Sequence, residues 1–204
     1  TFLALLEILQ QFGCLDELTP TEIGRTVAAL RGDNELWLGL ALMSGHLDDL
    51  SAPDLAAVFE AISTEVNRPD LWSGFPPPPA AEEALHDLSG LRRELLRAQE
   101  RLGVVVPAWW EPELMGLVEA WAKGTDWSDL IANTSLDEGD VVRLLRRTVD
   151  LLAQLPYCPA VSEELRSNGR RALQMINRFP VKEAVVEGVV DDSLNPATMR
   201  AASD

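Results

Sequence analysis

Three arginines, an aspartate and a glutamine lie at spacings that bring them to one side of a single helix: Arg143, Arg146, Arg147, Asp150 and Gln154. Guanidinium groups at i, i+3 and i+4 repel one another by a few tenths of a kcal/mol per pair, and a polyanion along the helix would turn this repulsion into attraction. The guanidinium group of one arginine can also bind two oxygens of one phosphate at the same time. The pattern therefore fits a phosphate-binding stripe. It also fits a solvated face on which Arg146 or Arg147 pairs with Asp150, and spacing alone favours this simpler interpretation.

The other residue types that commonly do chemistry are sparse and badly spaced. The two cysteines, Cys14 and Cys158, and the two histidines, His46 and His86, lack the spacing of metal ligands or of a nucleophile with its base. The sequence has no phosphate loop, no dinucleotide fingerprint and no nucleophile elbow. We therefore expect no catalytic residue, cofactor site or metal site in this chain, and the low cysteine content indicates a reducing compartment.

The overall charge is strongly acidic. The 204 residues carry 33 acidic and 17 basic side chains, giving a net charge of −16 and an isoelectric point near 4.4. A free-standing nucleic-acid binder normally has a basic footprint, so the chain taken whole does not fit that class. The basic residues are nevertheless clustered, because 14 of them, against 21 acidic ones, fall in residues 81–204.

Length and hydropathy patterning indicate a packed helical protein. A 47% hydrophobic content allows a sizeable core in one domain or two small ones. No apolar run approaches the roughly 20 residues that span a membrane, so we expect no membrane partner. The 3.6-residue periodicity predicts helices over residues 2–12, 35–44, 51–63, 82–102, 107–123, 125–133, 138–155, 161–178 and 180–190.

These elements predict an all-α multi-helix bundle with two parts. Residues 1–33 read as helix, short strand, turn and short strand, which fits the tail of a winged-helix unit. Residues 34–204 form the bundle. Both ends interrupt a helical pattern, with the last helix starting near Pro196, so we expect the chain to be a piece of a longer protein.

The helix that carries the arginine stripe has the clearest local signals. Ser135 and Glu138 form a capping box that predicts its start, and Pro156 stops it. The side opposite the stripe is apolar and should be buried: Val141, Leu144, Leu145, Thr148, Leu151, Leu152 and Leu155.

Residues 67–80 form a proline-rich surface loop. The run Pro76 to Pro79 is expected to lie outside any helix. The flanking aromatic residues Trp72 and Phe75 are expected to pin the loop to the core. In the long helix that follows, Gly90 could interrupt the backbone.

Two functions other than a phosphate stripe are open. The short helix, turn and long helix from Thr125 onward resemble a helix-turn-helix, which would make Asp140, Arg143 and Arg147 readers of DNA bases. Alternatively, the acidic surface could dock a basic protein. An exposed apolar groove near Trp72 or the pair Trp109-Trp110 would mark such an interaction module.

A family resemblance runs through the same region. It rests on Trp121-Ala122-Lys123-Gly124, Trp127-Ser128-Asp129-Leu130, Thr134-Ser135, Glu138-Gly139-Asp140-Val141-Val142-Arg143, Leu145-Arg146-Arg147 and Leu151-Leu152-Ala153-Gln154-Leu155. Weaker matches lie upstream, in Leu18-Thr19, Gly24-Arg25-Thr26-Val27-Ala28, Asn34-Glu35-Leu36-Trp37 and Ser51-Ala52-Pro53-Asp54-Leu55. These motifs resemble the C-terminal helical (DSHCT) domain of superkiller-like DExH-box RNA helicases.

The resemblance implies an accessory role. In that family two RecA-like domains, absent from this chain, bind ATP and Mg²⁺ and hydrolyse ATP, and the helical domain helps to enclose single-stranded RNA. One long "ratchet" helix faces the RNA, and residues 138–155 align with it. Arg147 and Asp150 fall at its RNA-facing positions with Arg143 close by, and Asp150 stands where the family usually has Glu. The resemblance thus implies RNA and the RecA-like domains as partners, alongside possible protein partners. It also implies a bacterial cytoplasm or an organelle of bacterial descent.

Overall fold

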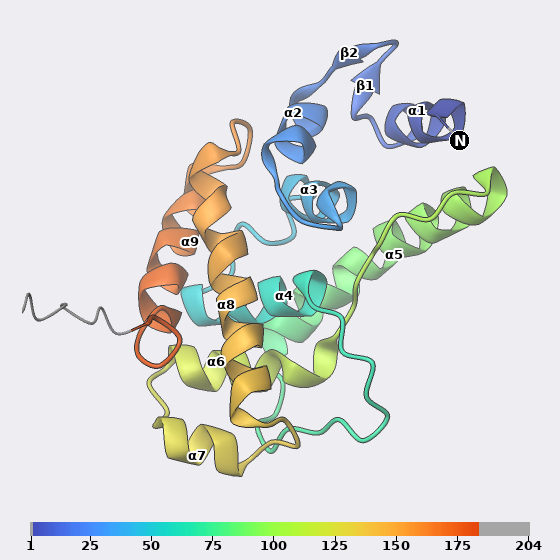
Figure 1. Ribbon diagram of the computed structural model, residues 1–204. Helices are drawn as coiled ribbons and strands as arrows, with labels where there is room; N and C mark the ends of the chain where they lie inside the picture. Colours follow the sequence, from blue (N-terminus) through green and yellow to red (C-terminus); the bar gives the residue numbers. More distant parts are fainter. Residues whose placement is uncertain (1, 184–204) are drawn as a thin grey trace, which may run out of the picture.

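The computed structural model describes residues 2–183, and within them nearly all of the regular secondary structure is helical (Figure 1). The prediction of an all-α multi-helix bundle is confirmed. The elements are α1 (Phe2–Gln11), β1 (Leu15–Asp16), β2 (Thr19–Pro20), α2 (Glu22–Ala29), α3 (Glu35–Met43), α4 (Ala52–Ser63), α5 (Pro79–Leu102), the 3-10 turn η1 (Pro112–Leu114), α6 (Met115–Ala122), α7 (Trp127–Ala132), α8 (Glu138–Gln154), the 3-10 turn η2 (Leu155–Tyr157) and α9 (Glu163–Ile176).

Helix α4 is the centre of the bundle. It contacts α5, α6, α8 and α9, and nearly all of its side chains are buried. Ser51 caps its start by accepting a hydrogen bond from the backbone N–H of Asp54, and Pro53 lies in its first turn. The small residues Ala56, Ala57 and Ala61 let the neighbouring helices approach from several sides. Because α8 packs on α4, the stripe helix is held by the core of the domain.

The N-terminal part packs at one end of the bundle. β1 and β2 form an antiparallel hairpin with Leu15 opposite Pro20, which confirms the two short strands. Helix α2 follows the hairpin and packs on α3; it was not predicted. Figure 1 shows the far end of α5 alongside α1, where Arg101 donates a hydrogen bond to Gln11 (2.6 Å). The division of the chain at residue 33 stays a prediction.

Two predictions about the proline-rich loop and the helix that follows it were wrong. Helix α5 begins at Pro79, so the last proline of the run is inside the helix. Proline is tolerated there because the first helical N–H groups have no partner within the helix anyway. Helix α5 is also continuous through Gly90 and ends at Gly103, whose left-handed backbone caps it.

Several other helix boundaries also differ from the prediction. Residues 107–111 lie outside any helix, and this segment is held by hydrogen bonds from the backbone N–H of Glu111 to Ala61 and from Arg92 to the carbonyl of Ala108. Helix α9 is two residues shorter at each end than 161–178. Residues 180–183 are not helical. The rest of the predicted helix 180–190, and the helix expected near Pro196, lie outside the described residues.

None of the helices between residues 2 and 183 combines the length and the apolar character that crossing a bilayer requires.

Candidate functional site

Helix α8 has one buried side and one open side, as its sequence periodicity predicts. The predicted apolar residues Val141, Leu145, Thr148 and Leu152 are at most 1% exposed. Thr148 donates its hydroxyl to the carbonyl of Leu144, so the one polar group on this side has a partner. The open side carries the arginine stripe.

Helix α8 begins at Glu138 as predicted, but its N-cap lies two residues after the predicted one. Asp137, not Ser135, is the N-cap, and its carboxylate accepts from the backbone N–H of Asp140 (2.7 Å). Ser135 instead accepts a hydrogen bond from the backbone N–H of Trp72 (2.9 Å). The capping box fails because the hydroxyl of Ser135 is engaged by a distant loop.

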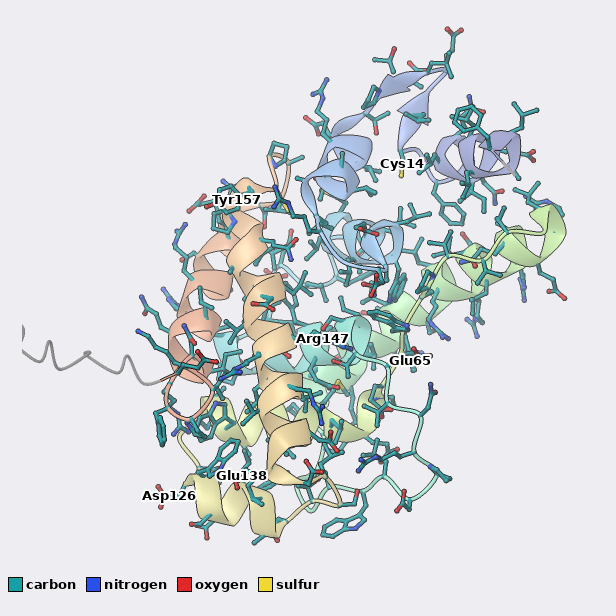
Figure 2. The ribbon with its side chains drawn as sticks, in the orientation of Figure 1. Cys14, Glu65, Asp126, Glu138, Arg147 and Tyr157 are labelled. Atoms are coloured by element: carbon teal, nitrogen blue, oxygen red, sulfur yellow. The ribbon has the colours of Figure 1, made fainter. Side chains whose placement is uncertain are left out.

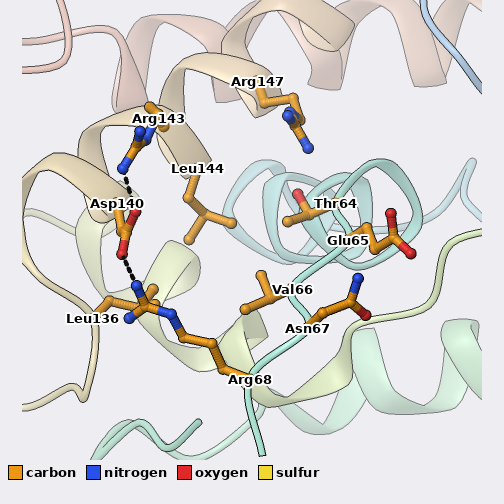
Figure 3. A pocket seen from close by; sticks show the side chains of 10 residues that line it. All are labelled: Thr64, Glu65, Val66, Asn67, Arg68, Leu136, Asp140, Arg143, Leu144 and Arg147. Atoms are coloured by element: carbon orange, nitrogen blue, oxygen red, sulfur yellow. Dashed lines mark hydrogen bonds and ion pairs between the residues drawn. The ribbon is translucent and has the colours of Figure 1, made fainter.

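Two hollows lie along the open side of α8. The first, of about 280 Å³, is lined by the start of α8 and by residues 64–68, which follow α4 (Figure 3). The second, of about 180 Å³, is lined by the end of α8, residues 31–34 and Trp109. Arg147 lines both, and Figure 2 shows it midway along α8. The two hollows therefore meet at Arg147, and together they form one concave strip along α8.

Asp140 holds two arginines at the first hollow. Its carboxylate pairs with Arg68 (2.7 Å) and with Arg143 one helical turn away. The Arg143 side chain is still 75% exposed. Both guanidinium groups thus keep donors available at the rim of the hollow.

Trp109 supports Arg147 from the other side of the strip. The guanidinium of Arg147 lies 5.8 Å from the centre of the Trp109 ring, a cation–π distance. The carbonyl of Trp109 accepts a hydrogen bond from the indole of Trp37 (3.0 Å). Trp110 turns inward, where it packs against Trp37 and under Arg92.

The remaining predicted stripe residues have different surroundings. Asp150 and Gln154 line the second hollow. The amide of Gln154 is engaged by the backbone of Arg31, accepting from its N–H (2.7 Å) and donating to its carbonyl (3.2 Å). Arg146 points elsewhere, donating to the carbonyl of Val181 (2.9 Å) and pairing with Glu183 (3.2 Å). The strip therefore joins Arg143, Arg147, Asp150 and Gln154 and leaves Arg146 out.

Pairing with Asp150 does not account for the arginines. In the described part of the chain, neither Arg146 nor Arg147 forms an ion pair with Asp150.

The proline-rich loop is fastened beside the first hollow. Ser73 and Thr134 form an isolated antiparallel bridge, and the backbone N–H of Gly74 donates to Asn133 (2.8 Å). Phe75 packs against the core, as predicted, whereas the side chain of Trp72 is half exposed and the loop is held there by its backbone. This fastening helps to place Arg68 at Asp140.

The residues that commonly do chemistry elsewhere in the chain are not assembled. Burial raises the pKa of the Cys14 thiol to about 11 and also raises the pKa of Cys158, so both thiols stay protonated and unreactive. His46 is exposed beside Asp87 (3.8 Å). Between residues 2 and 183, no His, Cys, Asp and Glu side chains gather in a group able to hold a metal ion.

Sequence reasoning missed three residues of the strip. Arg68 and Thr64 come from the segment after α4, and Trp109 from the irregular segment before η1. Trp109 was singled out only as part of an aromatic pair. A lone Thr or Arg in an irregular segment carries no periodic signal, so only the tertiary structure shows these residues.

Comparison with known proteins places the chain in a family. Residues 17–184 match the DSHCT (NUC185) domain, and the chain belongs to this family. The resemblance noted in the sequence is thereby confirmed.

Its relatives include named helicases. The chain is 36% identical over 165 residues to the chloroplastic DExH-box ATP-dependent RNA helicase DExH15 of Arabidopsis thaliana, covering 79% of this chain and 14% of that protein. It is 28% identical over 178 residues to the probable helicase HelY of Mycobacterium leprae, covering 81% and 19%. It is 24% identical over 144 residues to the human exosome RNA helicase MTR4, covering 65% and 13%. The chain thus spans less than a fifth of the length of these relatives.

Proposed function

We propose that this chain is the accessory C-terminal domain of an ATP-dependent RNA helicase, and that the open side of α8 guides single-stranded RNA. The observation that supports this most directly is the concave strip along α8. Its two hollows share Arg147, and Arg143 and Arg68 stand at the rim of the first. A groove with local basic groups and an aromatic platform suits a single strand, because phosphates and base faces are both available.

The strip has groups for both parts of a nucleotide. Arg143 and Arg147 supply donors for phosphate oxygens, and Asp150 supplies an acceptor for base or ribose donors. Asp150 keeps the charge of the Glu usual in the family with a shorter reach. Trp109 presents its ring beneath Arg147. ATP and Mg²⁺ would act in RecA-like domains of the same protein, which these residues do not contain. We further infer a bacterial cytoplasm or an organelle of bacterial descent as its location.

The test reverses the charge of Arg147, which lines both hollows, in the complete natural protein. Arg147→Glu should lower the rate of RNA unwinding by about tenfold or more, corresponding to roughly 1.4 kcal/mol of lost strand contact. ATP hydrolysis without RNA should be unchanged. Arg97→Glu makes the same charge change on the exposed side of α5 and should unwind normally. Normal unwinding by the Arg147→Glu protein would contradict the proposal.

A further inference from the structure

The first hollow has an apolar wall in addition to its arginines. Its sides are apolar, formed by Leu136 and Leu144, both nearly buried, and by Val66. Figure 3 shows Val66, Leu144 and Thr64 turned toward the same space. At about 280 Å³ the hollow lies just below the usual range of small-molecule sites, about 300 to 1,000 Å³. It therefore suits one small group.

A buried hydroxyl in this hollow has no partner. Thr64 is 4% exposed, and its Oγ1 makes no hydrogen bond with any residue between 2 and 183. The residue directly follows α4 in an extended conformation, which turns its side chain away from the helix. A buried polar group without a partner costs free energy, so native proteins rarely retain one. A ligand with a hydrogen-bonding edge would supply the missing partner.

Charge at the rim narrows the class of ligand. Arg68 and Arg143 flank Asp140 at one side, Arg147 lies at another, and Glu65 is an exposed carboxylate at the same hollow. This mixture does not favour a wholly anionic ligand inside. It suits a neutral ring in the hollow whose attached phosphates meet the guanidinium groups outside.

We propose that this hollow takes one unstacked base of the single-stranded RNA that α8 guides. The base face lies between Leu144 and Val66, and its edge bonds the Thr64 hydroxyl. The phosphate on one side of it meets Arg68 and Arg143. The strand would thus bend locally at this nucleotide, because a splayed base leaves the stack of its neighbours. This inference rests on the proposed function.

The first test follows the base itself. The probe is a short oligoadenosine with a single 2-aminopurine at successive positions, bound to the complete natural protein, because stacked adenines quench this fluorophore in the free strand. This fluorophore brightens when it leaves a stack, so at one position its emission should rise several-fold on binding. Val66→Phe fills the hollow and should abolish that rise. Equal emission at all positions, or an unchanged rise in Val66→Phe, would overturn the proposal.

The second test removes only the hydroxyl. Thr64→Val keeps the shape and should weaken oligouridine binding by about fivefold, the share of one hydrogen bond. Its thermal midpoint should not fall, because the lost hydroxyl had no partner in the protein. Thr148→Val removes a buried hydroxyl that bonds Leu144 and should leave RNA affinity unchanged. Unaltered affinity in Thr64→Val would refute the assigned hydrogen bond.

The two proposals fail differently. If Arg147→Glu stops unwinding while the fluorophore and Thr64→Val show no effect, the base site is wrong and the guiding role of α8 stands. If Arg147→Glu has no effect on unwinding, both are wrong.

Discussion

Glu60 is an ionisable residue in a fully buried position. It lies in the last turn of α4, and neither carboxylate oxygen has a hydrogen-bond partner among residues 2–183. Burial raises its pKa well above the usual 4.5, and the nearby carboxylate of Glu111 raises it further. The folded domain therefore holds this carboxyl protonated at pH values where the unfolded chain has ionised it.

A neutral replacement should change how stability depends on pH. Because the folded pKa of Glu60 is raised, its favourable contribution is complete below pH 4.5 and is lost as pH rises toward the folded pKa. Glu60→Gln removes that loss, so its free energy of unfolding should not fall across this pH range as that of the wild type does. The measurement is urea unfolding from about pH 5.5 to 8.

The matched control for Glu60→Gln is on the surface. Glu94→Gln makes the same change at an exposed position of α5 and should leave the pH profile of the wild type intact. A wild-type profile in the Glu60→Gln protein would show that the buried carboxyl is not held protonated.

At the scale of elements, residue spacing predicts the features that depend on residues near in the sequence. It misses the features that depend on contacts with residues far away in the sequence. The buried side of α8 follows from a 3.6-residue period, and the structure confirms it. The N-cap of that helix could not be predicted from spacing, because Trp72, far away in sequence, donates a hydrogen bond to the predicted cap Ser135. The hollow beside α8 was also beyond prediction, since Arg68 and Asp140 meet only in the folded chain.

The loop that supplies Arg68 depends on one close backbone approach. A Cβ on Gly116 of α6 would collide with the backbone carbonyls of Phe75 and Pro76. Gly116→Ala should therefore destabilise the domain by about 1 to 3 kcal/mol, the range for overpacking a buried contact. Urea unfolding of the variant measures this directly.

The same substitution should have the opposite effect where there is space. Gly90, within α5, has no atom near the position of an added Cβ. Gly90→Ala should stabilise the domain by about 0.5 to 1 kcal/mol, because alanine loses less backbone entropy in a helix. Equal effects of the two substitutions would mean that the approach of residues 75–76 to α6 does not constrain the loop.

At the scale of the whole molecule, net charge and local charge act in opposite directions. A chain of net charge −16 repels RNA at long range, and this repulsion is screened by salt beyond about 10 Å. The arginines at α8 act at contact distance. When an arginine binds a phosphate, the counterions condensed on that phosphate are released into the solvent. The acidity therefore opposes RNA binding by the domain as a whole and leaves the strip able to bind.

Salt dependence separates the two contributions. Each phosphate contact on a single strand adds about 0.7 to the slope of log affinity against log salt. In the complete natural protein, Arg143→Gln with Arg147→Gln should lower that slope by about 1.4. Arg93→Gln with Arg97→Gln makes the same net-charge change on an exposed side of α5 and should leave the slope unaltered. If both pairs lowered it equally, the effect would come from overall charge, and α8 would have no special contact with the strand.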